Sequence, residues 1–154
     1  MTKKYDVVVI GARPAGYVAA VRCAQLGLSV ACVDEWHNHL GESSLGGTCL
    51  NMGCIPSKAL LHAAKVIDEA EEMSAFGIDF GQPKIDAKKL LAWKNSIVKR
   101  LTGGLEMLAK QRKVNIVHGK GGFSGPNTLV VEGKGGETTL QFDQAVFAVG
   151  SLLV

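Results

Sequence analysis

The sequence predicts an α/β fold in which a parallel sheet, covering helices and a small antiparallel β-meander form one unit. Three observations predict it. Residues 6–10 form a short, continuous apolar run, which is typical of a strand buried on both faces. A glycine-rich turn, a helical pattern and a second apolar run follow in the order of a β-α-β unit. Two strand-like segments separated by glycines, at 128–132 and 138–142, predict the meander.

Composition limits the function classes. The chain has 154 residues, 47% apolar and 20% charged, which is enough to bury a core. No apolar run approaches the roughly 20 residues of a membrane span, and residues 1–6 lack the features of a signal peptide. The net charge of +3 is dispersed, which gives little support for nucleic-acid binding. We therefore expect a cytoplasmic protein that binds neither membranes nor nucleic acid, a setting in which a disulfide is more often catalytic than structural.

The first β-α-β unit carries most of a dinucleotide-binding fingerprint. Gly11 and Gly16 lie between the first strand and a helix expected over 17–26, and the second strand ends at Asp34, near the expected distance of roughly 20 residues. Arg13 stands where the fingerprint has its middle glycine, which lets the backbone approach a pyrophosphate. We expect this side chain to displace the phosphates, although its cation could contact them. The alternative is a plain strand-to-helix turn without a ligand.

The rest of the chain divides into loops, two long helices and short strands. A polar loop over 35–45 contains His37 and His39, which we expect to be solvated rather than metal ligands. A helix is expected from Pro56 to about Ala75, with its apolar face at Leu60, Ala64, Ile67 and Ala70. A second is expected from near Asp86 to Lys113, interrupted at Gly103-Gly104, with a core-packing stripe at Leu90, Trp93, Ile97, Leu101, Leu105 and Leu108. Further strands are expected at 115–118 and 144–149, and 119–123 is expected to be a turn.

Two cysteines lie at the start of the first long helix. Cys49 and Cys54 follow a pair of glycines, and Pro56 is suited to a first helical turn. A thiolate at Cys54 would lie at the positive end of the helix dipole, which favours a redox pair. The alternatives are ordinary buried thiols or half of a zinc site, but zinc needs four ligands and no second close pair is present. Cys23 and Cys32 lie in apolar surroundings and are expected to be inert.

The segment at residues 46–58, GGTCLNMGCIPSK, resembles the active-site disulfide motif of the flavin disulfide reductases, the class I pyridine nucleotide-disulfide oxidoreductases. Leu50, Ile55 and Ser57 look most like the dihydrolipoamide dehydrogenases; glutathione and mercuric reductases share the frame, usually with valine where this chain has Leu50 and Ile55. The similarity continues from the first strand to the last residue. It implies a Rossmann-like FAD-binding half-domain in which residues 1–154 form a partial FAD/NAD(P)-binding domain.

The resemblance also implies a role for individual residues. Cys49 would react with the dithiol substrate, and Cys54 would face the flavin. Lys58 would tune the flavin, Asp34 would bind the adenosine ribose, and Gly121 would approach the adenine. The implied cofactor-binding residues are Gly11, Gly16, Asp34, Gly47, Thr48, Lys58, Gly121 and Gly150. The family usually has Ala-Thr-Gly-Ser at the last turn, whereas this chain has Val149 in place of the threonine, in the segment 148–151.

The resemblance covers only the first part of a family enzyme. In the family, an NAD-binding domain, a segment that completes the FAD site and a dimerisation domain with a catalytic His–Glu pair follow. These 154 residues contain no second glycine fingerprint and no histidine in the family's His-Pro context. The implied enzyme oxidises dihydrolipoamide and passes electrons through FAD to NAD. Its substrate is carried on lipoyl domains of 2-oxoacid dehydrogenase complexes or of the glycine cleavage system, and the full-length family enzyme is a homodimer.

We expect the 154 residues alone not to reduce NAD with dihydrolipoamide. We also expect the chain to be a fragment or truncated product of such an enzyme. Two alternatives belong to other classes. One is a small thiol-disulfide or flavin module of the glutathione or mercuric reductase type that works with a partner. The other is a non-catalytic remnant.

Overall fold

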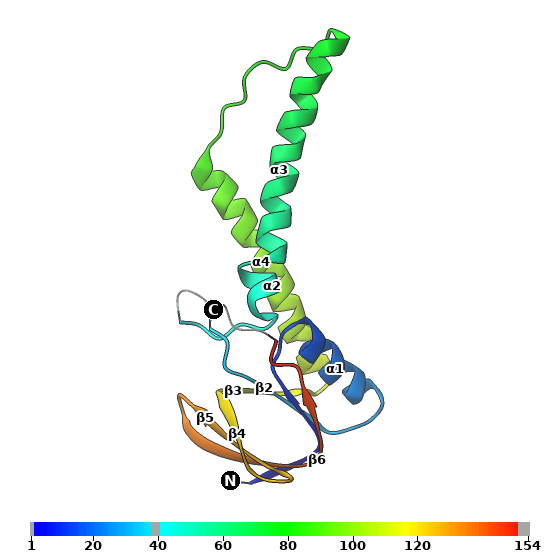
Figure 1. The fold of residues 1–154 in the computed structure, drawn as a ribbon, viewed down its shortest axis with the longest axis vertical. Coiled ribbons are helices and arrows are strands. Elements are labelled where there is room, and N and C mark those ends of the chain that lie inside the picture. Colours follow the sequence, from blue (N-terminus) through cyan, green and yellow to red (C-terminus); the bar gives the residue numbers. More distant parts are fainter. Residues whose placement is uncertain (1, 38–40, 151–154) are drawn as a thin grey trace.

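The computed structural model describes residues 2–37 and 41–150. A sheet with one short helix against it forms the body, and two long helices rise from it as an arm (Figure 1). The elements in chain order are β1 (Lys3–Ile10), α1 (Pro14–Gln25), β2 (Val30–Asp34), α2 (Gly47–Asn51), α3 (Cys54–Glu72), the 3₁₀ turn η1 (Met73–Phe76), α4 (Ala87–Gln111), β3 (Asn115–His118), β4 (Lys120–Gly125), β5 (Thr128–Gly133) and β6 (Gly136–Phe147).

The sheet combines a parallel and an antiparallel part. Its strand order is β3-β2-β1-β6-β5-β4. Strands β3, β2, β1 and β6 are parallel neighbours, whereas β6, β5 and β4 pair antiparallel as a meander. The predicted α/β class, with a parallel sheet and a small meander, is confirmed.

The core lies on both faces of the central strands. Val7 and Val9 of β1 point to the face that α1 and α4 cover, where they join Ala20 and Ala109. Val8 points to the opposite face and packs with residues of the meander, among them Leu129. Because successive side chains of a strand alternate between faces, the apolar run of β1 is buried on both sides, as its sequence predicts.

Two strand predictions are wrong. The segments expected as separate strands at 138–142 and 144–149 are joined in one strand, β6, which ends at Phe147; β1 pairs with it from Lys3 opposite Leu140 to Ile10 opposite Phe147. The glycines at 119–123 were expected to form a turn, but most of them belong to β4, which pairs with β5.

The helix boundaries also differ from the prediction. Helix α3 begins at Cys54 and ends at Glu72, and the unpredicted helix α2 precedes it. Helix α4 continues through Gly103 and Gly104, at which an added Cβ would meet nothing, and the nearby Thr102 and Ala109 are buried. The cost of about 1 kcal/mol for each glycine in a helix is therefore outweighed by packing of its neighbours.

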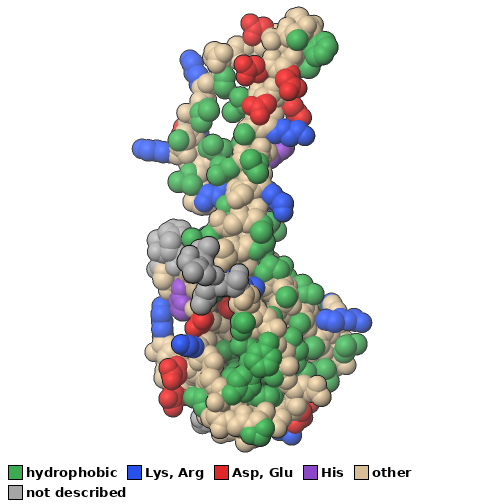
Figure 2. Space-filling model, viewed as in Figure 1, with side chains coloured by type: hydrophobic (Ala, Val, Ile, Leu, Met, Phe, Trp, Pro, Cys, Tyr) green, Lys and Arg blue, Asp and Glu red, His purple; other side chains and the backbone are tan. Residues whose placement is uncertain are grey.

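The arm leaves much of its apolar surface exposed. The stripe predicted as core is interrupted, because Trp93 is 40% and Leu101 is 39% exposed. On α3, Leu60 is exposed, and Pro56 and Ala59 are buried instead. The hairpin extends beyond the sheet, so each helix has mainly the other to pack against, and hydrophobic side chains gather on its surface (Figure 2). None of the described helices is long and apolar enough to cross a membrane.

Candidate active site

A glycine-dependent loop presents the two cysteines. Gly46 and Gly47 have φ angles of +92° and +56°, which glycine adopts without strain, and they lead into α2, which contains Cys49. The backbone N–H of Gly53 then donates to the carbonyl of Thr48 at 2.7 Å, closing the turn between α2 and α3. Cys54 is the first residue of α3, where the backbone N–H groups have no partner within the helix. The sequence therefore places one sulfur on a short helix and the other at the start of a long one.

The two thiols lie at the same cavity. All four cysteines of the chain are free thiols in the structure, and Cys49 and Cys54 both line this cavity. Interaction with the neighbouring Cys54 side chain, together with desolvation and the charge of an ionised Cys54, holds the pKa of Cys49 above its ordinary value. The positive charge of Lys58, one turn into α3, acts in the opposite direction. The ionisation of Cys49 therefore depends on both Cys54 and Lys58.

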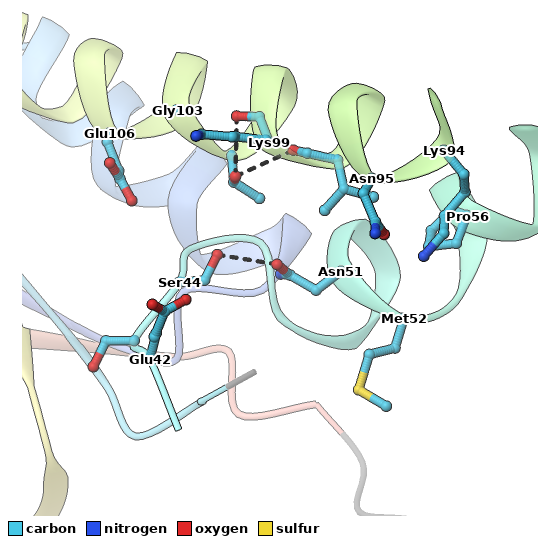
Figure 3. Close-up of a pocket in the computed structure, with 13 residues that line it drawn as sticks. Glu42, Ser44, Asn51, Met52, Pro56, Lys94, Asn95, Lys99, Gly103 and Glu106 are labelled. Carbon is cyan, nitrogen blue, oxygen red and sulfur yellow. Dashed lines mark hydrogen bonds between the residues drawn. The ribbon is translucent and has the colours of Figure 1, made fainter. Parts of the chain in front are cut away.

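Asn51 holds the loop that carries Cys49, a role that the sequence prediction missed. Its side-chain amide donates to the carbonyls of Gly47 at 2.8 Å and Leu45 at 3.1 Å. Its side-chain oxygen accepts from the hydroxyl of Ser44 at 3.0 Å (Figure 3). An asparagine between two cysteines in a glycine-rich segment was the available signal, because asparagine side chains bond readily to nearby backbone groups.

Several predicted site residues share one cavity. A cavity of about 450 Å³ is lined by Arg13, Pro14, Ala15, Thr48, Cys49, Gly53, Cys54, Ala148 and Gly150. It joins the start of α1, the dithiol and the end of β6. Thr48, Cys49, Cys54 and Gly150 are thus brought together, with Gly47 beside them under the Arg13 side chain. Ser151, which follows Gly150 in the predicted turn, lies outside the described residues, as does His39.

Gly11, Gly16 and Asp34 build the turn behind this cavity. A Cβ on Gly16 would overlap the carbonyl oxygen of Gly11, and a Cβ on Gly11 would overlap the carbonyl of Ala148. Gly16 thus allows α1 to pack closely on the turn, and Gly11 allows the end of β6 to approach the turn. Asp34 is only 7% exposed and accepts a hydrogen bond from the backbone N–H of Ala12 at 3.1 Å. Burial raises the pKa of Asp34, against the lowering effects of this hydrogen bond and of the charges of Arg13 and His118.

Gly121 lies apart from the dithiol. It is paired with Val131 in the meander, where a Cβ would come within 3.1 Å of Leu129. Of the other cysteines, Cys32 is fully buried and Cys23 is half-buried. Desolvation, with a smaller effect of the Asp34 charge, raises the pKa of Cys32 to about 12, so this thiol is unreactive in the folded chain.

A larger cavity than the one at the thiols lies nearby. A cleft of about 740 Å³ lies on the other side of α2, between the loop containing Glu42 and Ser44 and the side chains of α4 such as Lys94 and Lys99 (Figure 3). It exposes Met52 and Asn51 but neither cysteine. Within the described ranges, no group of three or more His, Cys, Asp or Glu residues could hold a metal ion.

The Arg13 side chain lies beside the turn between β1 and α1, close to Gly47 and Gly150. The Cγ atom of Arg13 is 2.5 Å from the position that a Cβ of Gly47 would take, and its Cδ atom is 2.7 Å from the corresponding position at Gly150. The side chain therefore fills the space beside the start of α1, which a pyrophosphate would need. Arg13 lines the same cavity as Cys54.

Known proteins of one family resemble this chain. Residues 5–153 match the pyridine nucleotide-disulphide oxidoreductase family, and the chain belongs to that family. Relatives include the dihydrolipoyl dehydrogenases of Vibrio cholerae serotype O1, 53% identical over 148 residues, and of Haemophilus influenzae, 50% identical over 149 residues. Each alignment covers 96% of this chain and 30% of the relative, so the chain spans about 30% of the length of these relatives.

A solved structure shares the fold. The flavoprotein disulfide reductase RclA from Escherichia coli, in a structure described as its Cu(II) complex, superposes with a TM-score of 0.78 at 25% sequence identity. The match covers 99% of this chain and 30% of RclA. The relatives above are dihydrolipoyl dehydrogenases, so the alternative modules of the glutathione or mercuric reductase type are not favoured.

Proposed function

We propose that this chain is the N-terminal redox-disulfide part of a dihydrolipoyl dehydrogenase and that Cys49 and Cys54 exchange electrons with a dithiol substrate. The observation that carries the proposal is the pair of free thiols, Cys49 on α2 and Cys54 at the start of α3, which line one cavity near the charge of Lys58. The dihydrolipoyl dehydrogenases that are 53% and 50% identical to this chain support the choice of dihydrolipoamide as the dithiol.

The proposed exchange begins from the oxidised pair. One thiolate of dihydrolipoamide attacks the sulfur of Cys49, the Cys49–Cys54 bond breaks, and Cys54 leaves as a thiolate at the positive end of the α3 dipole. The second substrate sulfur then attacks the first, which closes the cyclic disulfide of lipoamide and releases Cys49. Two electrons pass to the protein, and the two protons of the substrate dithiol are matched by those of the reduced cysteine pair.

The proposal assigns further components to a protein of the relatives' length. These are FAD as the acceptor beside the dithiol, NAD as the final acceptor, and lipoyl domains of 2-oxoacid dehydrogenase complexes or the glycine cleavage system as substrate carriers. We also propose that the full-length protein is a homodimer and lies in the cytoplasm. Cysteines are usually reduced in that compartment. Residues 1–154 would be the first segment of the FAD domain. For these residues themselves, the proposed activity is the exchange step.

A stoichiometric assay tests the proposal. The chain is oxidised, freed of oxidant and mixed with excess dihydrolipoamide under argon, and the lipoamide formed is measured. We expect one lipoamide per chain, none from Cys49→Ser or Cys54→Ser, and an unchanged yield from Cys23→Ser. A yield that survives both Cys49→Ser and Cys54→Ser would contradict the assignment.

A further inference from the structure

We propose that Arg13 excludes the pyrophosphate of a dinucleotide from the turn between β1 and α1, so that this one side chain lowers the affinity of the chain for FAD. The inference concerns the cradle beside the dithiol and is independent of the exchange reaction proposed above.

The backbone of the turn is intact. The N–H of Gly11 donates to the carbonyl of Val33 at 2.7 Å, and the N–H of Gly46 donates to the carbonyl of Ala12 at 2.9 Å. Arg13 has φ −72° and ψ 176°, an extended conformation open to any residue, and its carbonyl accepts from the N–H of Tyr17 at 3.0 Å. The turn and the helix therefore form with arginine as they would with glycine, and the difference lies in the side chain alone.

The Arg13 side chain crosses the space between two glycine turns. Besides the close approaches of its Cγ and Cδ atoms, its Nη1 and Nε atoms lie 3.0 and 3.1 Å from the position of a Cβ on Gly150. Gly47 and Gly150 both have positive φ angles, +56° and +69°. The Arg13 side chain thus occupies the space that these two glycines leave open by having no Cβ. A pyrophosphate at the start of α1 requires this same volume.

Displacement of the side chain would also separate charges. Arg13 is half-buried, and its positive charge lowers the pKa of the buried Asp34, so it contributes to the stability of that carboxylate. Rotation of Arg13 into solvent would remove this interaction. The opposite possibility has a distinct consequence: if the guanidinium swings aside and pairs with the phosphates, its removal must weaken FAD binding.

Binding titrations with the full chain separate the two possibilities. Apo protein is titrated with FAD and, separately, with riboflavin, which has the same ring and no phosphate, and flavin fluorescence is followed. The variants are Arg13→Gly, Arg13→Ala and the control Arg22→Ala on the exposed side of α1. Circular dichroism shows whether each variant is folded. If Arg13→Gly does not fold, Arg13→Ala still tests the inference.

We expect Arg13→Gly and Arg13→Ala to bind FAD at least about tenfold more tightly than the parent chain, with Arg22→Ala unchanged. Riboflavin affinity should be the same in all four proteins. FAD affinity that is unchanged or weaker in both Arg13 variants would overturn the inference. So would an equal gain for riboflavin, because the effect would then not involve the pyrophosphate.

Discussion

Replacing Asn51 by aspartate should destabilise the loop that carries Cys49. Aspartate retains the oxygen that accepts from Ser44 but lacks the N–H groups that donate to the carbonyls of Gly47 and Leu45 at 2.8 and 3.1 Å. A typical hydrogen bond contributes about 1 kcal/mol net, so the loss of two corresponds to about 2 kcal/mol. The new carboxylate would also face two carbonyl oxygens. We therefore expect the free energy of unfolding to fall by about 2 kcal/mol.

Urea unfolding followed by circular dichroism measures this change. Asn95→Asp is the matched control, because it makes the same chemical change on the α4 side of the same cleft at an exposed residue (Figure 3). Ser44→Ala removes only the hydrogen bond to the Asn51 oxygen and should cost about 1 kcal/mol or less. If Asn51→Asp and Asn95→Asp unfold at the same urea concentration, the hydrogen bonds from the Asn51 amide to Gly47 and Leu45 do not stabilise the chain, and the reasoning is refuted.

Three further predictions concern charge, burial and backbone. Lys58→Met should raise the pKa of Cys49 further, so the pH profile of Cys49 alkylation should move to higher pH, whereas Lys65→Met, further along α3, should leave it in place. The pKa of Cys32 is raised to about 12 in the folded chain, whereas in the unfolded chain it is near 9. The unfolded chain therefore ionises Cys32 as the pH rises above about 9 while the folded chain does not, and stability is lost. Between pH 8 and 10.5 the free energy of unfolding of the parent chain should fall by about 2 kcal/mol more than that of Cys32→Ala. An equal pH dependence in the two proteins would contradict this. Gly16→Ala should cost at least about 2 kcal/mol because its Cβ overlaps the carbonyl of Gly11, while Gly103→Ala, in open space on α4, should gain up to about 1 kcal/mol in thermal or urea unfolding.

The parts of the fold that depend on local patterns could be predicted from the sequence. The run at 6–10 and the strand ending at Asp34 follow from apolar continuity, because parallel strands are covered on both faces. The start of α3 follows from glycines, cysteines and a proline within a few residues.

The remaining features depend on contacts between distant segments. Gly103 and Gly104 look like a helix break, but α4 continues because Thr102 and Ala109 on either side are buried. The exposure of Trp93 could not be predicted, because an apolar stripe does not reveal how far a helix extends beyond its sheet. The position of Arg13 against Gly47 and Gly150 joins three segments far apart in the chain. The sequence shows that Arg13 replaces the middle glycine of the fingerprint, but only the structure shows where its side chain lies.

The most direct test of the redox assignment is disulfide mapping of the oxidised chain. After mild oxidation, free thiols are alkylated, the protein is digested, and the linked peptides are identified by mass spectrometry. We predict a single disulfide, between Cys49 and Cys54, which reforms after each cycle of reduction and oxidation. Cys23 and Cys32 should be alkylated slowly in the folded chain and fully only after unfolding. Free Cys49 and Cys54 in a chain whose Cys23 has formed a disulfide would contradict the account.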